Sequence, residues 1–328
     1  MADTTWFRKC GWGVITHYLA DMYGADGEDF GGEAWSRRVD SFDVPRLARQ
    51  LGEVGAGYYY MTIGQCSGHY CSPNATYDDI VSIRPSKCSQ RDLVADIADA
   101  LAPRGIAMMM YLAAEGPALD VPAREALGWV GNHWDDPDLA GRNVVNTWPD
   151  KGQRVFHSNW QKVIREWSLR WGPKVRGWWI DGCRYKSLWY EHPEPPNLAS
   201  FAAALRAGND KAIVAFNGDI FVPVRIWTEL DDYTCGEIAW ALPSDPNVGR
   251  SEKVGGKQYH ILSHLGTKWG WGTPRFPDEL AVGYTKYVTQ LGGVITWDVP
   301  IGNDGRISDE FVRQLAAIGR AMSRDRPG

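Results

Sequence analysis

The chain has 328 residues, of which 44% are hydrophobic, and its formal net charge is −5 at pH 7. This length suits one large α/β domain or two ordinary ones. The acidic balance and the lack of a Lys/Arg stripe argue against nucleic acid as a partner. No 18 apolar residues run together, and no basic segment followed by an apolar one opens the sequence. We therefore expect no membrane span and no signal peptide in this sequence, and a soluble protein that is cytoplasmic or secreted after loss of its signal.

Strands and helices are predicted to alternate along the chain. Short apolar runs that fit strands buried on both faces cover residues 12–19, 57–64, 106–113, 175–181, 212–218, 259–265 and 292–299. Helical periodicity covers residues 43–55, 89–105, 158–172, 197–208 and 278–293. No repeat or linker divides the chain, so we expect a single α/β domain over residues 1–328, a (β/α)8-type, TIM-like barrel. A doubly wound open sheet is the alternative, although no Gly-rich phosphate loop follows the first strand.

Polar side chains stand at the C-terminal ends of these strands, the end that carries the active site in a (β/α) barrel. They are His17, Gln65, His69, Glu115, Asp181, Asn217 and Asp298. Asp181 ends an apolar run that contains Trp178 and Trp179, and Gly182 follows it. We therefore expect a stiff strand to hold the Asp181 carboxylate at the rim of the barrel; the alternative is that Asp181 caps the next helix.

Two further features favour a carbohydrate-active enzyme. The sequence holds 17 Trp residues, and flat rings with a polar edge suit the faces of sugar rings. Hydrolysis of a glycoside uses two carboxylates, and segment 229–240 offers Glu229, Asp231, Asp232 and Glu237. Glu237 lies among small and apolar neighbours, where partial desolvation favours the protonated form that a general acid needs. We therefore pair Asp181 with Glu237.

Four motifs, in order, resemble the catalytic domain of glycoside hydrolase family 29, the retaining α-L-fucosidases. They are WFRKCGWGVITHYL (6–19), WGPKVRGWWIDG (171–182), DYTCGEI (232–238) and GGVITWDVPIGNDGRI (292–307). The resemblance covers residues 6 to about 310. It implies a retaining mechanism with Asp181 as nucleophile, Glu237 as acid/base and His17 as a sugar-binding histidine.

The expected sugar pocket departs from that family's pattern. Gln65 and Cys66 stand where the family has paired histidines after the second strand, and His69 is displaced. The family's arginine before the acid/base has two candidate counterparts, Asn217 and Arg225. The C-terminal β-sandwich common in the family has no counterpart in this sequence. The resemblance thus implies a retained catalytic pair and an altered sugar specificity.

Four tryptophans are candidate walls of the pocket: Trp179, Trp269, Trp271 and Trp297. Trp269 and Trp271 belong to a Gly-, Trp- and Pro-rich loop, residues 266–276, which follows a predicted strand and is expected to face substrate. His260 and His264 share one face of that strand, and we expect one to face the pocket and the other to be structural.

The six cysteines include no CxxC pair and no Cys/His cluster at zinc-ligand spacing, so neither a metal nor another cofactor is predicted. Cys66 and Cys71 are close enough for a loop disulfide, although buried or unused thiols are the favoured interpretation. Asn74 begins a glycosylation sequon, a short pattern that also arises by chance.

The leading hypothesis is a retaining glycoside hydrolase that acts on an α-L-fucoside or a stereochemically related glycoside in an oligosaccharide or polysaccharide. A barrel that binds a glycan without cleaving it is the first alternative, and the two acids count against it. A metal-dependent barrel hydrolase is the second; it would carry an HxH pair on the first strand, where only His17 is present. The exact sugar, its linkage, endo or exo action and the oligomeric state stay open.

Overall fold

The computed structural model describes residues 2–20, 31–129, 153–183, 193–240, 242 and 252–324. Eight parallel strands form one sheet in the order β5-β4-β3-β2-β1-β10-β9-β6. They are β1 (Trp12–Thr16), β2 (Tyr58–Thr62), β3 (Ala107–Ala113), β4 (Val175–Asp181), β5 (Ile213–Phe216), β6 (Glu237–Ile238), β9 (His260–His264) and β10 (Val294–Asp298). Seven of these confirm the predicted strands; the two-residue β6 is additional. A small antiparallel pair, β7 (Lys253–Val254) and β8 (Lys257–Gln258), lies apart.

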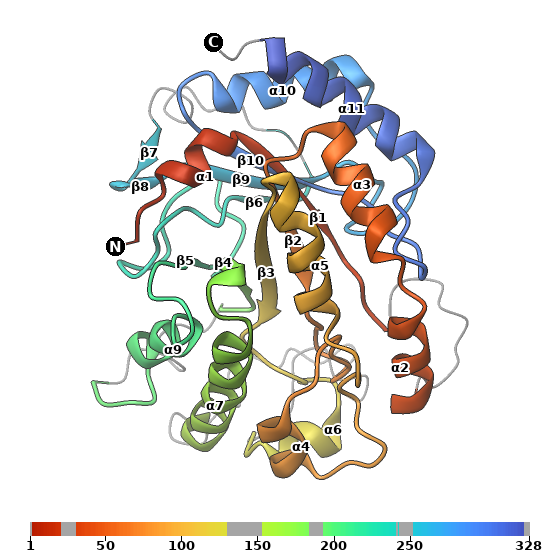
Figure 1. Ribbon diagram of the computed structural model, residues 1–328. Coiled ribbons are helices and arrows are strands. Elements are labelled where there is room, and N and C mark those ends of the chain that lie inside the picture. The colour runs from red at the N-terminus through yellow and green to blue at the C-terminus, as the bar shows by residue number, and fades with distance from the viewer. Residues whose placement is uncertain are drawn as a thin grey trace, which may run out of the picture.

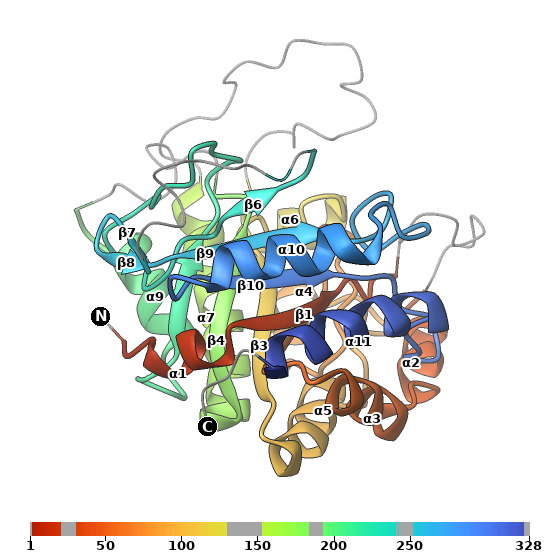
Figure 2. The ribbon, with the colours of Figure 1, turned by 90° about the horizontal axis from the view of Figure 1, so that it is seen from above.

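Helices pack around the curled sheet, most of them on its outer side (Figures 1 and 2). They are α1 (Thr5–Cys10), α2 (Gly32–Asp40), α3 (Val44–Val54), α4 (Ala75–Val81), α5 (Leu93–Leu101), α6 (Val121–Ala126), α7 (Gln153–Trp171), α9 (Leu198–Leu205), α10 (Asp278–Thr289) and α11 (Asp309–Arg324). Neighbouring helices pack in the order α10, α11, α3, α5, and α7 packs on α9. The five predicted helices correspond to α3, α5, α7, α9 and α10. No helix among the described residues has the length and hydropathy needed to cross a membrane.

Side chains along each strand alternate between the two faces of the sheet. Trp178 packs in a larger core between sheet and helices, whereas Trp179 packs in a smaller core inside the curl. Phe7 of α1 enters this inner core and contacts the rings of Tyr58 and Tyr233. Because Phe7 precedes β1 and Tyr58 begins β2, these rings fill the N-terminal end of the curl. These rings do not fill the C-terminal end of the curl, where the pocket described below lies.

The sheet has the strand order of a barrel, but its two edge strands, β5 and β6, do not pair. We call the gap between β5 and the residues that lead into β6 the β5–β6 seam. One backbone hydrogen bond crosses it, from Asp232 N to Val214 O at 2.8 Å. The carboxylates of Asp231 and Asp232 also cross it, accepting the N–H groups of Phe216 and Val214, each at 2.9 Å. The fold is therefore an α/β, TIM-like curled sheet that stays open as a strand ladder at this seam.

Candidate active site

A pocket opens at the C-terminal ends of the strands. Its volume of about 160 Å³ is below the roughly 300–1,000 Å³ of drug-sized ligand sites, so it suits one sugar ring rather than several. Two carboxylates, polar side chains and apolar walls line it: His17, Leu19, Gln65, Tyr111, Trp179, Asp181, Glu237, Leu262 and Trp269. Six of these residues are sequence-predicted site residues, which the fold brings together from five different segments, since Trp179 and Asp181 both belong to β4.

Asp181 is fixed in the pocket by donors on both of its oxygens. The Tyr111 hydroxyl donates to Oδ2 at 2.5 Å, and the backbone N–H of Gly182 donates to Oδ1 at 2.8 Å. Gln65 Nε2 donates in turn to the Tyr111 hydroxyl at 2.8 Å. Gly182 has φ +72°, a conformation that favours glycine, and this explains the glycine after the acid. The carboxylate therefore has one defined orientation at the end of β4.

Asn217 joins the two acids. It follows β5, and its backbone N–H donates to the Ile180 carbonyl of β4 at 2.7 Å. Its side-chain Nδ2 donates to Asp181 Oδ1 at 3.0 Å and to Glu237 Oε2 at 2.5 Å. These two carboxylate oxygens are therefore at most about 5.5 Å apart, the length of both hydrogen bonds laid end to end. The Asn217 amide thus brings the two carboxylates, one from β4 and one from β6, close to each other in the pocket.

His17 contributes a polar wall with a fixed ring. Its Nδ1 lies 2.7 Å from Oδ1 of Asp298, a fully buried residue at the end of β10 whose Oδ2 accepts the N–H of Gly270 at 2.5 Å. Burial lowers the pKa of His17, but Asp298, followed by Asp181 and Glu237, outweighs it and raises the pKa above its ordinary value. With Nδ1 engaged by Asp298, Nε2 is the ring nitrogen that can donate to a ligand.

Aromatic rings give the pocket its apolar surface. Trp179 stacks on Tyr111, with ring centroids 5.4 Å apart and planes 16° from parallel. Its indole N–H donates to the Cys235 carbonyl at 3.1 Å, which fixes the ring. Trp269 lies 6.0 Å from the His17 ring and 4.8 Å from the His264 ring. The walls therefore belong to side chains that are themselves held by packing.

Trp297 does not line the pocket, and its sequence-based prediction is wrong. The side chain is fully buried on the helix side of β10, where Nε1 donates to Thr285 Oγ1 of α10 at 2.9 Å. Alternation along the strand explains this, because the next residue, Asp298, is the one that meets His17.

Three further predicted residues lie beside the pocket rather than in it. His69 is buried against the edge of Trp35, with ring centroids 5.9 Å apart. Trp271 is 45% exposed and lines a separate open groove of about 850 Å³. The Arg225 guanidinium lies 3.8 Å from the ring centroid of Phe221, in a hollow whose walls include Asn217 and Glu237. Of these, Arg225 is therefore next to the acids but is separate from the main pocket.

His260 and His264 are both structural, so the expectation that one faces the pocket is wrong. His260 is fully buried, with Nδ1 at 2.9 Å from the Thr234 carbonyl and Nε2 at 2.7 Å from Thr296 Oγ1. Burial lowers its pKa to about 4. The two ring nitrogens of His264 lie 2.7 and 2.9 Å from the carbonyls of Gly266 and Ala239.

The remaining minor features have structural explanations. Cys66 and Cys71 are not joined by a disulfide. Asn74 is fully buried, caps α4 and donates to the Val163 carbonyl at 2.9 Å, so it is closed to a glycan in the folded chain. Across the described ranges, no group of three or more His, Cys, Asp or Glu residues could hold a metal ion.

Tyr111 is the main pocket residue that the sequence reasoning missed. It belongs to the apolar run of β3, whose methionines suggest only a core strand. Its register partner is Trp179 and its face is that of Met109. A tyrosine hydroxyl near the C-terminal end of a buried strand, on the same face as the predicted pocket tryptophan, was the available signal.

No protein-family model matches the sequence, and no curated protein matches it. Solved structures do match. The endo-fucoidan hydrolase P5AFcnA from glycoside hydrolase family 107 superposes with TM-score 0.71 at 17% identity, over 97% of this chain and 93% of that one. The family 107 endo-fucoidan hydrolase MfFcnA9 gives 0.72 at 15% identity, over 100% and 66%. This chain spans about half (55%) of a third such protein, MfFcnA4.

Structures of α-L-fucosidases also match. Alpha-L-fucosidase isoenzyme 1 from Paenibacillus thiaminolyticus gives TM-score 0.61 at 15% identity, over 98% of this chain and 75% of that one. A family 29 α-L-fucosidase from Bacteroides thetaiotaomicron gives 0.62 at 15% identity, over 97% and 72%. The sequence motifs pointed to family 29, but the structural likeness is not specific to that family. At these low identities it shows that the chain shares the fold of the two families.

Proposed function

We propose that the protein is a retaining glycoside hydrolase of the fucosidase-like type. The observation that carries this proposal is the Asn217 amide, which donates to Asp181 and Glu237 at once and so sets two carboxylates at the floor of a sugar-sized pocket. Retaining enzymes hold their two carboxyl groups about 5–5.5 Å apart, and inverting enzymes about 6.5–9.5 Å. The upper limit of about 5.5 Å between the bridged oxygens supports the retaining mechanism.

The roles follow from the two environments. An oxygen of Asp181 attacks the anomeric carbon while Glu237 gives its proton to the departing glycosidic oxygen, so that a covalent glycosyl ester forms as the glycosidic bond breaks. Glu237 then takes a proton from water, whose oxygen attacks the same carbon and releases Asp181. Among the described residues, Asp181 Oδ1 accepts two hydrogen bonds, whereas Oδ2 accepts one, from the Tyr111 hydroxyl. Oδ2 is therefore our choice for the attacking atom.

We infer that the sugar resembles fucose in ring stereochemistry. The matching structures are described as fucosidases and endo-fucoidan hydrolases, which supports this class. His17 offers a donor, and Gln65, whose Nε2 is used by Tyr111, offers its carbonyl oxygen as an acceptor. Because Gln65 and Cys66 replace a histidine pair, we expect weak activity on plain α-L-fucosides and better activity on a relative such as an α-L-galactoside, a β-D-arabinopyranoside or a modified fucose.

The remaining site assignments extend outward from this sugar. We propose that Trp269 packs on its apolar face and that Trp271, in the neighbouring groove, contacts the rest of an oligosaccharide or polysaccharide. Arg225 lines a hollow together with Asn217 and Glu237, and we propose that it contacts the substrate on the side of the acid/base, Glu237. All of these residues belong to a single proposed domain, a (β/α) barrel closed at the seam by side chains.

A panel of nitrophenyl glycosides, followed by proton NMR of the first-formed product, tests the proposal. We expect hydrolysis of at least one fucose-like glycoside, with the first product in the anomeric configuration of the substrate. A first product of inverted configuration would refute the retaining mechanism. Binding of glycans by the wild type without any turnover would favour the alternative of a non-catalytic glycan-binding protein.

A further inference from the structure

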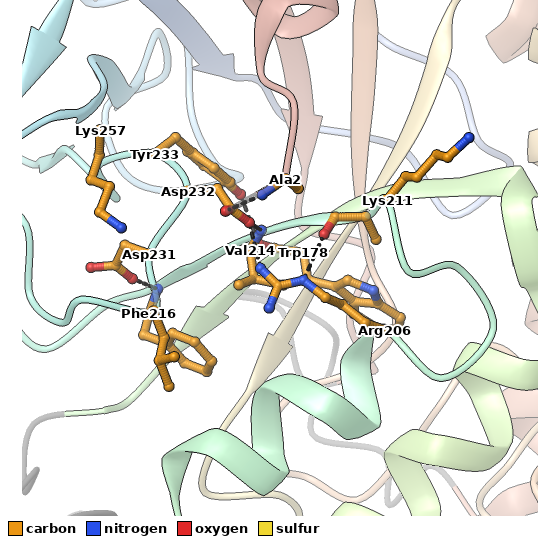
Figure 3. Close-up of polar contacts among 12 residues, drawn as sticks. Ala2, Trp178, Arg206, Lys211, Val214, Phe216, Asp231, Asp232, Tyr233 and Lys257 are labelled. Atoms are coloured by element: carbon orange, nitrogen blue, oxygen red, sulfur yellow. Dashed lines mark hydrogen bonds and ion pairs between the residues drawn. The ribbon is translucent and has the colours of Figure 1, made fainter.

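The edge of β5 is completed by carboxylates instead of a strand. Val214 and Phe216 are fully buried, and their N–H groups point into the β5–β6 seam. A buried N–H that lacks an acceptor costs as much free energy as a lost hydrogen bond. Asp232 Oδ2 accepts the first and Asp231 Oδ1 the second, each at 2.9 Å (Figure 3). Two consecutive acids thus stand in for the missing neighbour strand.

Asp231 holds the chain on both sides of Asn217. Its Oδ1 accepts the N–H of Phe216, the residue before Asn217. Its Oδ2 accepts the N–H groups of Trp227 and Thr228, each at 2.9 Å. The Trp227 ring lies directly on Gly218, the residue after Asn217, where an added Cβ would be 1.8 Å from the indole nitrogen. One carboxylate therefore fixes the residue before Asn217 directly and the residue after it through Trp227.

Asp232 is equally buried but holds other parts of the chain. Asp231 and Asp232 are 1% and 2% exposed. Asp232 accepts from Val214 N, from Arg206 Nη2 at 2.5 Å and from Ala2 N at 2.8 Å (Figure 3). None of these groups adjoins Asn217 or lines the pocket. Asp232 is therefore a matched control for Asp231.

We propose that Asp231 is a positioning residue of the active site, which sets Asn217 and, through it, the relative placement of Asp181 and Glu237. The proposal deepens the proposed function and rests on it. Asp231 does not line the pocket and contacts no substrate there. Its role is carried by four linked contacts: Asp231 to Phe216 and to Trp227, and Asn217 to each of the two acids.

All three N–H groups are accepted only when Asp231 is ionised, the form that predominates above a pH of about 7. Asparagine has the same shape but one acceptor oxygen, so it would turn a donor towards either Phe216 or the Trp227–Thr228 pair. Burial of Asp231 outweighs the three N–H donors and Lys257 and raises its pKa to about 7. Lys257 lies near Asp231 (Figure 3). Its Nζ donates to the Glu229 carbonyl at 2.7 Å.

Kinetics of Asp231→Asn, Asp232→Asn, Asn217→Ala and the double variant Asp231→Asn/Asn217→Ala test the proposal on the best glycoside of the panel, at a pH above about 7 where Asp231 is ionised. We expect Asp231→Asn to lower kcat about 10- to 100-fold with little change in KM, because small misplacements of catalytic groups cost about this much. Asp232→Asn should keep kcat within about threefold of the wild type while losing thermal stability. In the Asn217→Ala background, Asp231→Asn should lower kcat by no more than about threefold, since residues that act through one contact are not additive.

Equal kcat losses in Asp231→Asn and Asp232→Asn, or a full loss from Asp231→Asn in the Asn217→Ala background, would overturn the proposal. If Asp231→Asn does not fold, Asp231→Glu keeps the charge but displaces it by one methylene; a wild-type kcat in that folded variant would overturn the proposal as well. If the wild type cleaves no glycoside, the proposed function fails, and NMR then tests the positioning alone. Asp231→Asn should shift the Asn217 side-chain amide resonances and Asp232→Asn should not; equal shifts would refute the positioning role.

Discussion

Asp181 and Glu237 stand on two unlike parts of the same sheet. Asp181 ends β4, a seven-residue strand paired along its length with β3 on one side and with β5 on the other. Glu237 begins β6, a two-residue strand at the sheet edge whose one partner among the described strands is β9. Backbone ladders therefore hold the first acid, whereas the second stands beside the β5–β6 seam, which depends on the side chains of Asp231 and Asp232.

This difference suits the two proposed roles. A nucleophile acts best from a single preset geometry, and Asp181 has donors on both oxygens and a strand on each side. An acid/base must be protonated in one step and ionised in the next, so its surroundings have to accept both states. A short edge strand with one bridging amide allows small adjustments that a central strand would resist. The predictions below test this division from the largest expected effect to the smallest.

Removal of the nucleophile should have the largest effect. We expect Asp181→Ala to lower kcat by about 10⁴-fold or more on every glycoside, because no other group can form the covalent intermediate. The fold should persist, since backbone ladders hold β4. Steady-state kinetics with a circular dichroism control measures both. A folded variant that retains more than about 1% of the wild-type kcat would remove Asp181 from the nucleophile role.

Removal of the acid/base should depend on the leaving group. On glycosides with poor leaving groups, Glu237→Ala should lower kcat/KM about 10²- to 10⁴-fold, the usual contribution of general acid catalysis. On nitrophenyl glycosides the loss should be much smaller, because such leaving groups depart without a proton. Added azide should raise the rate and yield a glycosyl azide, detected by mass spectrometry. An equal loss on good and poor leaving groups contradicts the assignment.

The pocket variant Gln65→Ala should change specificity more than chemistry. Gln65 donates to the Tyr111 hydroxyl and offers its carbonyl oxygen to the sugar, so its loss leaves a polar group without its partner, at about 1–3 kcal/mol. We expect kcat/KM on the preferred glycoside to fall about 10- to 100-fold, which is that free energy in rate terms. Plain α-L-fucoside should be affected less. Efficient hydrolysis of plain α-L-fucoside that is indifferent to Gln65→Ala would show that the altered pocket does not set specificity.

The regular part of the sheet could be predicted from sequence, and the seam could not. Continuous apolar runs predicted β1 to β5, β9 and β10, and helical periodicity predicted α3, α5, α7, α9 and α10. The start of α5 was less clear: helical periodicity was predicted from residue 89, yet Asp92 caps the helix by accepting the N–H of Ala95. Strand β6 was not predicted, because a segment of two residues shows no hydrophobic periodicity. Asp231 and Asp232 were considered only as candidates for the second carboxylate, since nothing local in the sequence indicates that β5 lacks a neighbour strand.

The pocket shows the same division. Asp181, Glu237, His17 and Gln65 could be found because strand ends gather at one edge of the sheet. Trp297 was misassigned because the sequence shows that a strand exists but does not reveal which alternate residues face inward. The Asn217 bridge needs both β4 and the seam in place, so it becomes visible only in three dimensions.

The smallest predicted effect is a pH dependence in which the two parts of the molecule oppose each other. The pKa of Asp231, at the seam, is raised by burial from 3.8 to about 7, so the folded state binds that proton more tightly than the unfolded state. Its contribution to the free energy of unfolding is therefore greatest below the unfolded pKa and is lost as pH rises towards 7. The pKa of His260, on β9, is lowered by burial from 6.5 to about 4, so the unfolded state binds that proton more tightly. Its contribution is full above pH 6.5 and is lost as pH falls towards 4.

Between these limits the two slopes have opposite signs, and each is at most about 1.4 kcal/mol per pH unit. The Asp231→Asn variant lacks the pH dependence that Asp231 contributes to the free energy of unfolding and keeps the dependence that His260 contributes. In urea unfolding followed by tryptophan fluorescence, the variant should therefore gain stability with rising pH more steeply than the wild type, by up to about 1.4 kcal/mol per unit between roughly pH 4.5 and 6.5. Asp232→Asn serves as the control for the loss of a buried carboxylate at the same seam. An equal pH dependence of the free energy of unfolding in wild type and Asp231→Asn would mean that Asp231 does not retain its proton on folding. The raised pKa of Asp231 would then be wrong, and the positioning role would rest on the contacts of Asn217 alone.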